Sequence, residues 1–209
     1  MEPGLLEFHI DWAQATLHVD TERELFAPSV DYKLMNYLML GIYSGIHFKL
    51  RNTAPDAYLV HGCGIMDSGK CYLFTGPSGS GKTTVAKLAD GRKVLNDEAV
   101  LIGRNNKGFQ LAGTPMQGGI PDKCNTSVHL SSIFFLRHDT QVSLRKLSKV
   151  ETYIKLLTQI CDTSPLFEAA GDNSVHKIAD LSADIATGLP SYELGFRPDN
   201  SFWRVIETI

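Results

Sequence analysis

Residues 76–83 carry the pattern Gly-x-x-x-x-Gly-Lys-Thr, the spacing of a phosphate-binding loop. A triphosphate needs several backbone N–H groups converging on its oxygens, and glycines leave room for that approach. We expect Lys82 to reach the β- and γ-phosphates and the Thr83 hydroxyl to bind Mg²⁺. The residues expected to bind nucleotide are Gly76, Pro77, Ser78, Gly79, Ser80, Gly81, Lys82, Thr83 and Thr84.

A pair of carboxylates follows soon after this loop, at Asp97 and Glu98. Phosphoryl transfer needs an oxygen ligand for Mg²⁺ and a base for the acceptor hydroxyl, and two adjacent carboxylates can supply both. The alternative is a solvated Asp-Glu turn between two strands. From the residues alone the two interpretations stand about even.

These side chains require flanking elements in a fixed order. The pattern predicts a strand at Cys71–Thr75 entering the loop and a short helix at Thr84–Ala89 leaving it, cut off by Asp90-Gly91. This order disfavours the alternative that the loop pattern is a chance match in a Gly/Ser-rich surface turn. The helix is expected to begin near Thr83 with its positive end toward the phosphates.

A second strand is expected at Ala57–Cys63, with the turn residues Met66–Lys70 folding Cys71–Thr75 back beside it as a hairpin. This places His61 on the strand next to the loop strand. A single histidine on a strand is more often structural than catalytic, so position alone gives His61 no role.

The remaining chain predicts a mixed α/β fold. Strands are expected within Leu5–Val19 and an amphipathic helix over Asp31–Gly45. Val150–Ile160 predicts a second amphipathic helix, whose apolar face (Val150, Ile154, Leu157 and Ile160, with Glu151, Lys155 and Gln159 off it) packs on the sheet. A weaker helical pattern covers Ser174–Ile185, after a loop at Ala170–Asn173.

Composition narrows the functional classes. With 209 residues and 43% hydrophobic content, one domain spanning 1–209 is expected. A net charge of -3 with scattered basic residues argues against a nucleic-acid partner. The four cysteines have no zinc-site spacing, which favours reduced thiols and a cytoplasmic protein. No signal peptide is expected, and the most apolar stretch, Leu34–Ile46, is too short to span a membrane.

Three blocks in order resemble the kinase domain of the HPr kinase/phosphorylase family and its smaller relatives, which share a fold superfamily with phosphoenolpyruvate carboxykinase. The blocks are His61-Gly62, the loop at 76–83 and Leu95–Val100. Weaker similarity extends through Gly113-Thr114-Pro115, Ile133–Leu136 and Leu189–Leu194, so that it covers roughly 57–195. Residues 1–56 would add strands and a helix to the same domain.

The resemblance implies an ATP-dependent serine kinase, with ATP and Mg²⁺, acting on a protein or peptide. Asp97 matches the catalytic carboxylate that takes the proton from the acceptor hydroxyl, and His61 matches the histidine beside it. Lys82 would hold the phosphates and Thr83 the Mg²⁺. Glu98 stands at the second position of the family's Asp-Asp pair, as a further candidate metal ligand.

The sequence also departs from the family. Residues 111–119 lack the acidic and arginine signature associated with phosphorylase activity, so whether any such activity remains is open. Relatives are commonly oligomeric, and a homo-oligomer is likewise an open alternative. Two other functions stay in view: a nucleotide-binding regulatory module without transfer, and a kinase for a small-molecule hydroxyl.

Two further segments have alternative interpretations. The turn-rich loop with Thr114-Pro115 and Gly118–Pro121 would cover the nucleotide or admit the acceptor, or else simply connect strands. Arg137, in the charged Arg137-His138-Asp139 cluster, is a candidate cation for the transition state, although such clusters are more often solvated turns.

Overall fold

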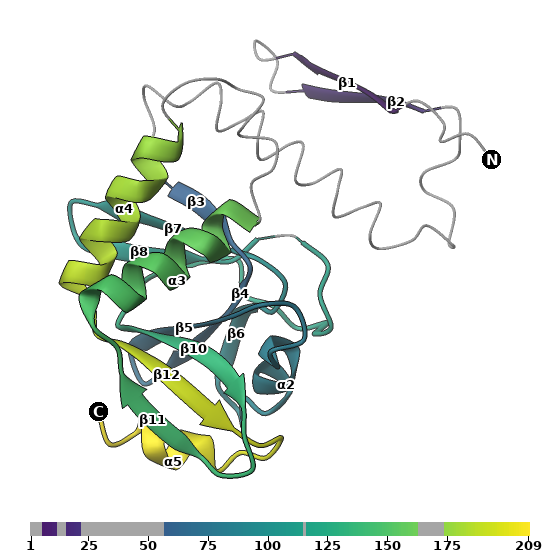
Figure 1. Ribbon diagram of the computed structural model, residues 1–209. Coiled ribbons are helices and arrows are strands. Elements are labelled where there is room, and N and C mark those ends of the chain that lie inside the picture. Colours follow the sequence, from purple (N-terminus) through teal and green to yellow (C-terminus); the bar gives the residue numbers. More distant parts are fainter. Residues whose placement is uncertain (1–5, 12–15, 22–56, 115, 163–173) are drawn as a thin grey trace.

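The computed structural model describes residues 6–11, 16–21, 57–114, 116–162 and 174–209, and it has a mixed α/β fold (Figure 1). The described strands form sheets of six, four and two strands. The expected mixed α/β class is therefore correct. The expected helix at Asp31–Gly45, the apolar stretch Leu34–Ile46, Pro115 and the loop at Ala170–Asn173 lie outside the described residues.

The six-stranded sheet carries the phosphate-loop pattern and has the order β11-β12-β10-β5-β4-β6. Three neighbouring strands run parallel, namely β5 (Lys70–Thr75), β10 (Ser132–His138) and β12 (Ser191–Phe196). Antiparallel strands complete the sheet, with β4 (Gly62–Asp67) and β6 (Lys93–Asn96) on one side and β11 (Ser143–Lys146) on the other. Parallel strands end at one edge, so the loop after β5 lies beside the ends of β10 and β12.

The four-stranded sheet is antiparallel throughout, in the order β3-β7-β8-β9. Its strands are β3 (Ala57–Val60), β7 (Val100–Asn105), β8 (Gly108–Ala112) and β9 (Ser127–His129). The chain passes between the two large sheets at His61, which separates β3 from β4, and again at 97–99, between β6 and β7. Both crossings carry residues singled out in the sequence.

The expected hairpin before the loop forms, with one correction. Its two-residue turn is Ser68-Gly69, at φ 50° and 82°, which joins β4 to β5. The single strand expected over Ala57–Cys63 is wrong, because the chain changes sheets at His61. His61 therefore lies one residue before Gly62, which pairs with Thr75 at the end of β5.

Two hydrophobic clusters hold the sheets and helices together. Helices α3 (Lys149–Asp162) and α4 (Ser174–Gly188) cover one face, where Leu156 and Ile178 join a core that includes Leu73 and Ile133. On the opposite face, α2 (Lys82–Lys87) and α5 (Phe202–Ile206) bury an aromatic core around Phe74. Figure 1 shows α3 and α4 on one side of the strands and α2 and α5 on the other. None of the helices in the described ranges is long and apolar enough to cross a membrane.

Helix α3 lies where the periodicity predicted it, and half of its predicted apolar face is inward, since Ile160 is fully buried and Leu157 packs against the core. Val150 and Ile154 are 67% and 56% exposed, while Thr152 and Gln159 are buried with Leu156. The helix starts with a capping box. There the Glu151 N–H donates to Ser148 Oγ and Glu151 Oε2 accepts from the Ser148 N–H.

The strands expected near the N-terminus are present as an antiparallel pair, β1 (Leu6–Asp11) and β2 (Thr16–Thr21). The pattern over Ser174–Ile185 is helix α4, which runs on to Gly188. Cys63, Cys71 and Cys124 are free thiols.

Candidate active site

The loop after β5 is closed by glycines whose side-chain space is taken by neighbours. Gly81 has φ +103°, and a Cβ there would lie 2.6 Å from Cζ of Phe196. A Cβ on Gly76 would lie 2.8 Å from Ser80 Oγ. The sequence folds this way because only glycine combines the left-handed backbone with so close an approach to the aromatic core.

Lys82 turns back into the loop. Its Nζ donates to the carbonyl oxygens of Gly76, at 2.8 Å, and Pro77, at 2.9 Å, and its side chain is only 5% exposed. Burial lowers the pKa of Lys82, because desolvation disfavours the charged amine. A buried cation whose partners in the loop are neutral carbonyls is well placed to exchange one of them for an anion.

Ser80 is a residue of the loop and is 6% exposed, and its Oγ is buried without a hydrogen-bond partner. An unsatisfied buried hydroxyl costs about 1–3 kcal/mol. The Ser80 side chain is not in the lining of the pocket that the neighbouring loop residues form.

The carboxylate turn is organised by Asn96, a residue to which the sequence analysis gave no role of its own. Asn96 is fully buried, and its Nδ2 donates to the carbonyl oxygens of Thr114, at 2.8 Å, and Met116, at 3.0 Å. Its Oδ1 accepts from the Glu98 N–H at 2.7 Å. Asn96 thus ties the turn after β6 to the loop that joins β8 to β9, here called the covering loop. Asx turns of this kind are the sequence signal that could have found it.

Asp97 is 1% exposed and faces the covering loop. Its Oδ2 accepts from the Gly119 N–H at 2.9 Å, and its Oδ1 accepts from the Ile120 N–H at 3.3 Å. The segment Gly118–Pro121 therefore lies over the candidate base. The loop thus contacts the candidate base directly, whereas its relation to a nucleotide or an acceptor stays a prediction.

Glu98 is the less enclosed of the two carboxylates. Burial raises the pKa of Glu98, and the neighbouring Asp97 raises it further, while Lys82 and Lys123 oppose the shift. Two carboxylates kept together near a single buried lysine form a region that a divalent cation would stabilise.

One pocket of about 290 Å³ brings the predicted side chains together. Asp97, Glu98 and His61 line it from the two crossings between the sheets, and most of the loop residues line it from the other side. Gly76, Pro77 and Ser80 are not in its lining; the first two hold Lys82 instead. The full lining is His61, Ser78, Gly79, Gly81, Lys82, Thr83, Thr84, Asp97, Glu98 and His138.

His138 belongs to this pocket, although the sequence analysis gave it no separate role. Its Nε2–H donates to the Gly79 carbonyl oxygen at 2.6 Å, and its ring stacks on Phe196 with centroids 6.0 Å apart. Strand β10 continues through His138, so the turn expected at 137–139 begins two residues later than predicted. The sequence signal that could have found His138 is its position at the end of a strand, because residues at the ends of parallel strands lie near the loop after β5.

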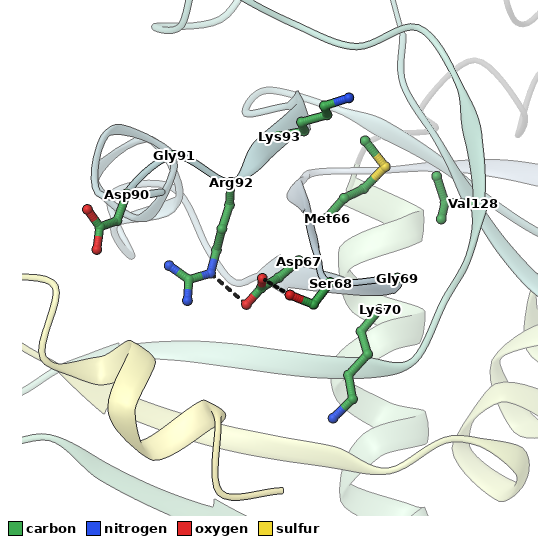
Figure 2. Close-up of a pocket in the computed structure, with 10 residues that line it drawn as sticks. All are labelled: Met66, Asp67, Ser68, Gly69, Lys70, Asp90, Gly91, Arg92, Lys93 and Val128. Carbon is green, nitrogen blue, oxygen red and sulfur yellow. Dashed lines mark hydrogen bonds and ion pairs between the residues drawn. The ribbon is translucent and has the colours of Figure 1, made fainter.

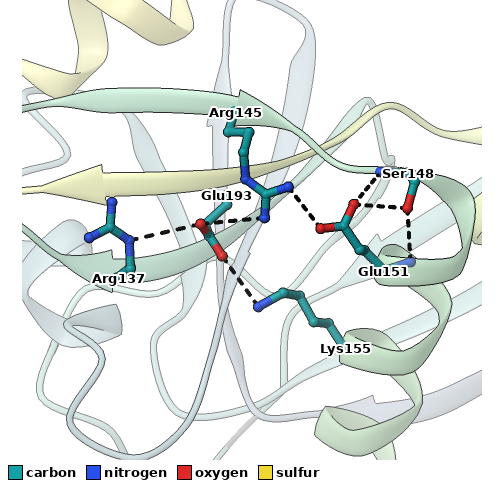
Figure 3. Close-up of polar contacts among 6 residues, drawn as sticks. All are labelled: Arg137, Arg145, Ser148, Glu151, Lys155 and Glu193. Atoms are coloured by element: carbon teal, nitrogen blue, oxygen red, sulfur yellow. Dashed lines mark hydrogen bonds and ion pairs between the residues drawn. The ribbon is translucent and has the colours of Figure 1, made fainter.

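Arg137, its neighbour on β10, is instead part of a surface network (Figure 3). Its Nη2 pairs with Asp139 at 2.7 Å, and its Nε lies 3.8 Å from Glu193. Arg145 and Lys155 also approach Glu193, at 3.5 and 3.4 Å. The pocket lining does not include Arg137, which leaves it engaged with carboxylates on the protein surface.

A second pocket, of about 620 Å³, lies between the β4–β5 turn and the turn after α2 (Figure 2). Two of its basic groups are already engaged: Arg92 Nε pairs with Asp67 at 2.7 Å, and Lys70 Nζ donates to the Ile209 carbonyl at 3.0 Å. Figure 2 shows the Lys93 and Asp90 side chains pointing away from this ion pair. The side chains do not converge on a common point.

Within the part of the chain that the structure describes, no three His, Cys, Asp or Glu side chains gather as a metal site. A Mg²⁺ ion would therefore rely on Thr83, the carboxylates and ligand oxygens, as is usual for this cation.

Comparisons with known proteins add no assignment. No protein-family model matches the sequence, and a search of curated proteins finds no match.

Proposed function

We propose that this chain is an ATP-dependent kinase that transfers the γ-phosphoryl group to a hydroxyl, that of a serine in a protein or peptide. The observation that carries the proposal is the pocket lined by Lys82 and Thr83 on one side and by Asp97, Glu98 and His61 on the other. Phosphate-binding and proton-accepting groups thus face the same space, as phosphoryl transfer requires.

The residues present fit a polyphosphate with Mg²⁺. The buried Lys82 amine supplies a donor for anionic oxygens, and Thr83 and Glu98 supply oxygen ligands. Bound Mg²⁺ would neutralise the charge on the phosphates. The volume of about 290 Å³ is near the lower limit for small-molecule sites, which suits the phosphates better than a whole nucleotide.

In this proposal each side chain has one task. Lys82 holds the phosphates, Asp97 takes the proton from the acceptor hydroxyl, and His61, which lines the same pocket, helps to orient that carboxylate. The choice of serine as the acceptor rests on the resemblance to HPr kinase-like domains. The same resemblance implies a phosphoenolpyruvate carboxykinase-like fold, which is part of this proposal. A cytoplasmic location belongs to the same proposal.

The test is transfer of label from γ-labelled ATP, with Mg²⁺, to serine peptides, proteins of a cell extract and small hydroxyl compounds. Asp97→Asn should keep nucleotide affinity and lose transfer by at least about 100-fold, the usual range for a general base. Asp122→Asn, an exposed carboxylate on the covering loop, is the matched control and should behave as wild type. Label in small compounds alone would move the acceptor class to small molecules.

A regulatory module that binds nucleotide without transfer is the second candidate. It is favoured by one observation, the 1% exposure of Asp97 beneath the Gly119 and Ile120 amides, which closes the base off from an acceptor. Tight nucleotide binding with no labelled product, equal in wild type and Asp97→Asn, would support the module and reject the kinase.

A further inference from the structure

Gly119 touches two residues that the proposed function places in different roles. Its N–H donates to Asp97 Oδ2 at 2.9 Å. A Cβ built on Gly119 would lie 2.5 Å from Thr83 Cγ2 and 3.3 Å from Asp97 Oδ2. The covering loop therefore lies directly against both the threonine of the phosphate loop and the candidate base.

The glycine is needed for space and not for backbone conformation. Its φ is outside the left-handed region that glycine favours, unlike those of Gly76, Gly79 and Gly81. A Cβ approach of 2.5 Å is far shorter than carbon–carbon van der Waals contact, so adding a methyl group must move the loop or the threonine.

The movement would change the chemistry of the site. Thr83 lies in α2 and is β-branched, so its χ1 has few allowed values there. Rotating the Cγ2 methyl away also swings the hydroxyl to a new direction, because both are bonded to the same Cβ. Moving the loop instead lengthens the Gly119–Asp97 hydrogen bond.

We propose that Gly119 is a positioning residue, whose N–H holds the Asp97 carboxylate and whose missing side chain leaves room for the present rotamer of Thr83, the residue that would ligate Mg²⁺. This inference rests on the proposed function for its catalytic meaning. It goes further because Gly119 belongs to the covering loop and to neither motif. This one residue would position both the Thr83 side chain and the Asp97 carboxylate.

The proposal predicts that a second substitution, Thr83→Ser, restores the activity lost in Gly119→Ala. Serine keeps the hydroxyl of Thr83, lacks the Cγ2 methyl and satisfies the same loop pattern. Gly119→Ala should lower turnover by about 100-fold, the order of loss expected from a 1 Å misplacement, and Thr83→Ser should restore most of it in the double variant. Thr83→Ser alone is measured as the reference with which the double variant is compared.

Gly118→Ala is the matched control on the neighbouring residue. A Cβ there would clash with the Asp97 carboxylate, while the atoms nearest to it include none of Thr83. Gly118→Ala should therefore lose turnover through the carboxylate, and Thr83→Ser should not restore it. Equal rescue of both glycine variants would overturn the proposed contact.

A second readout separates this proposal from the kinase itself. ATP affinity is measured by calorimetry with Mg²⁺ and with EDTA, and the ratio of the two reports the metal-dependent part of binding. Gly119→Ala should reduce this ratio and the double variant should recover it. If wild type binds MgATP but transfers nothing, the kinase fails while this ratio still decides the role of Gly119.

Wild-type turnover and an unchanged ratio in Gly119→Ala would overturn the proposal, as would failure of Thr83→Ser to restore either quantity. Should Gly119→Ala prove too unstable to purify, the double variant compared with Thr83→Ser alone decides the matter. Serine removes the clash with Thr83 Cγ2, so the double variant should match Thr83→Ser in turnover and in the affinity ratio.

Discussion

Asn96 and Glu98 are joined by a hydrogen bond of 2.7 Å, from the backbone N–H of Glu98 to the side-chain oxygen of Asn96. The amide nitrogen of the same side chain reaches across to the covering loop after β8. One buried amide thereby fixes the carboxylate turn and the loop that covers it.

Replacing Asn96 with alanine should therefore destabilise the protein strongly. The change removes the side-chain partner of the Glu98 N–H and of the Thr114 carbonyl oxygen, at about 1–3 kcal/mol for each buried group, whereas the Met116 carbonyl keeps its 2.6 Å hydrogen bond from Lys123 Nζ. We expect a loss of more than about 2 kcal/mol in urea unfolding. Asn105→Ala is the control, because Asn105 makes a similar bond to the Lys107 N–H in an exposed turn and should cost well under that amount.

Lys82→Met should separate stability from binding. The buried Lys82 amine has a lowered pKa because of desolvation, and its hydrogen bonds are to loop carbonyls. A methionine of similar length should leave the melting temperature of the nucleotide-free protein equal or higher, since functional groups of this kind are held at a cost in stability. Nucleotide affinity should fall by at least about tenfold, and a variant that still binds ATP normally would contradict the assignment of the loop.

Glu98 should make stability depend on pH in an unusual direction. Its folded pKa lies above the ordinary 4.5, so the folded state binds the proton more tightly than the unfolded chain. The free energy of unfolding should then fall as pH rises from about 4.5 through the folded pKa. Glu98→Gln should be more stable than wild type at about pH 7 without Mg²⁺, and equal to it near pH 4. Melting curves across this range test the sign.

The capping box of α3 should give the opposite pH response. The N–H of Ser148 and then the Arg145 side chain lower the pKa of Glu151 to about 2, so the stabilisation is present above 4.5 and lost as pH falls toward 2. Glu151→Gln should be less stable than wild type at about pH 7, and the difference should vanish near pH 2. Denaturant titrations at several pH values measure the difference.

Ser148→Ala tests the other half of that box. It should cost about 1 kcal/mol, a typical value for losing an N-cap hydroxyl. In a chain of this size that is a fall of about 2–4 °C in melting temperature. Thr140→Ala is the control, because Thr140 is an exposed residue outside any helix and loses a hydroxyl in the same way. Its melting temperature should stay close to that of wild type, and an equal fall in both variants would argue against the cap.

Local patterns predicted much of this fold, because they depend on residues close in sequence. The phosphate-loop spacing located the strand and short helix around it, and the periodicity at 150–160 located α3. The apolar face of α3 was predicted correctly at Leu157 and Ile160 and wrongly at Val150 and Ile154, because burial depends on strands far along the chain. The change of sheet at His61 is also a tertiary feature, as both flanking strands look continuous in the sequence.

The candidate site shows the same division. The residues of the phosphate loop could be named from the sequence because phosphate binding requires a fixed spacing of glycines and lysine. The roles of Asn96, Gly119 and His138 depend instead on contacts with residues far along the chain. These three residues have common sequence features, namely an Asx turn, a Gly-Gly dipeptide and a histidine at the end of a strand. Such features occur too often in proteins to indicate a site without the fold.

The two points where the chain passes between the large sheets, at His61 and at 97–99, are also where it delivers the candidate acid–base residues. Asp97 directly follows β6, and only β4 separates β6 from β5, the strand that enters the phosphate loop. The distance between the phosphate loop and Asp97 is consequently set within one sheet, by two strand spacings of about 4.8 Å each. The hydrogen bonds of that sheet thus hold the two halves of the candidate site at a constant separation.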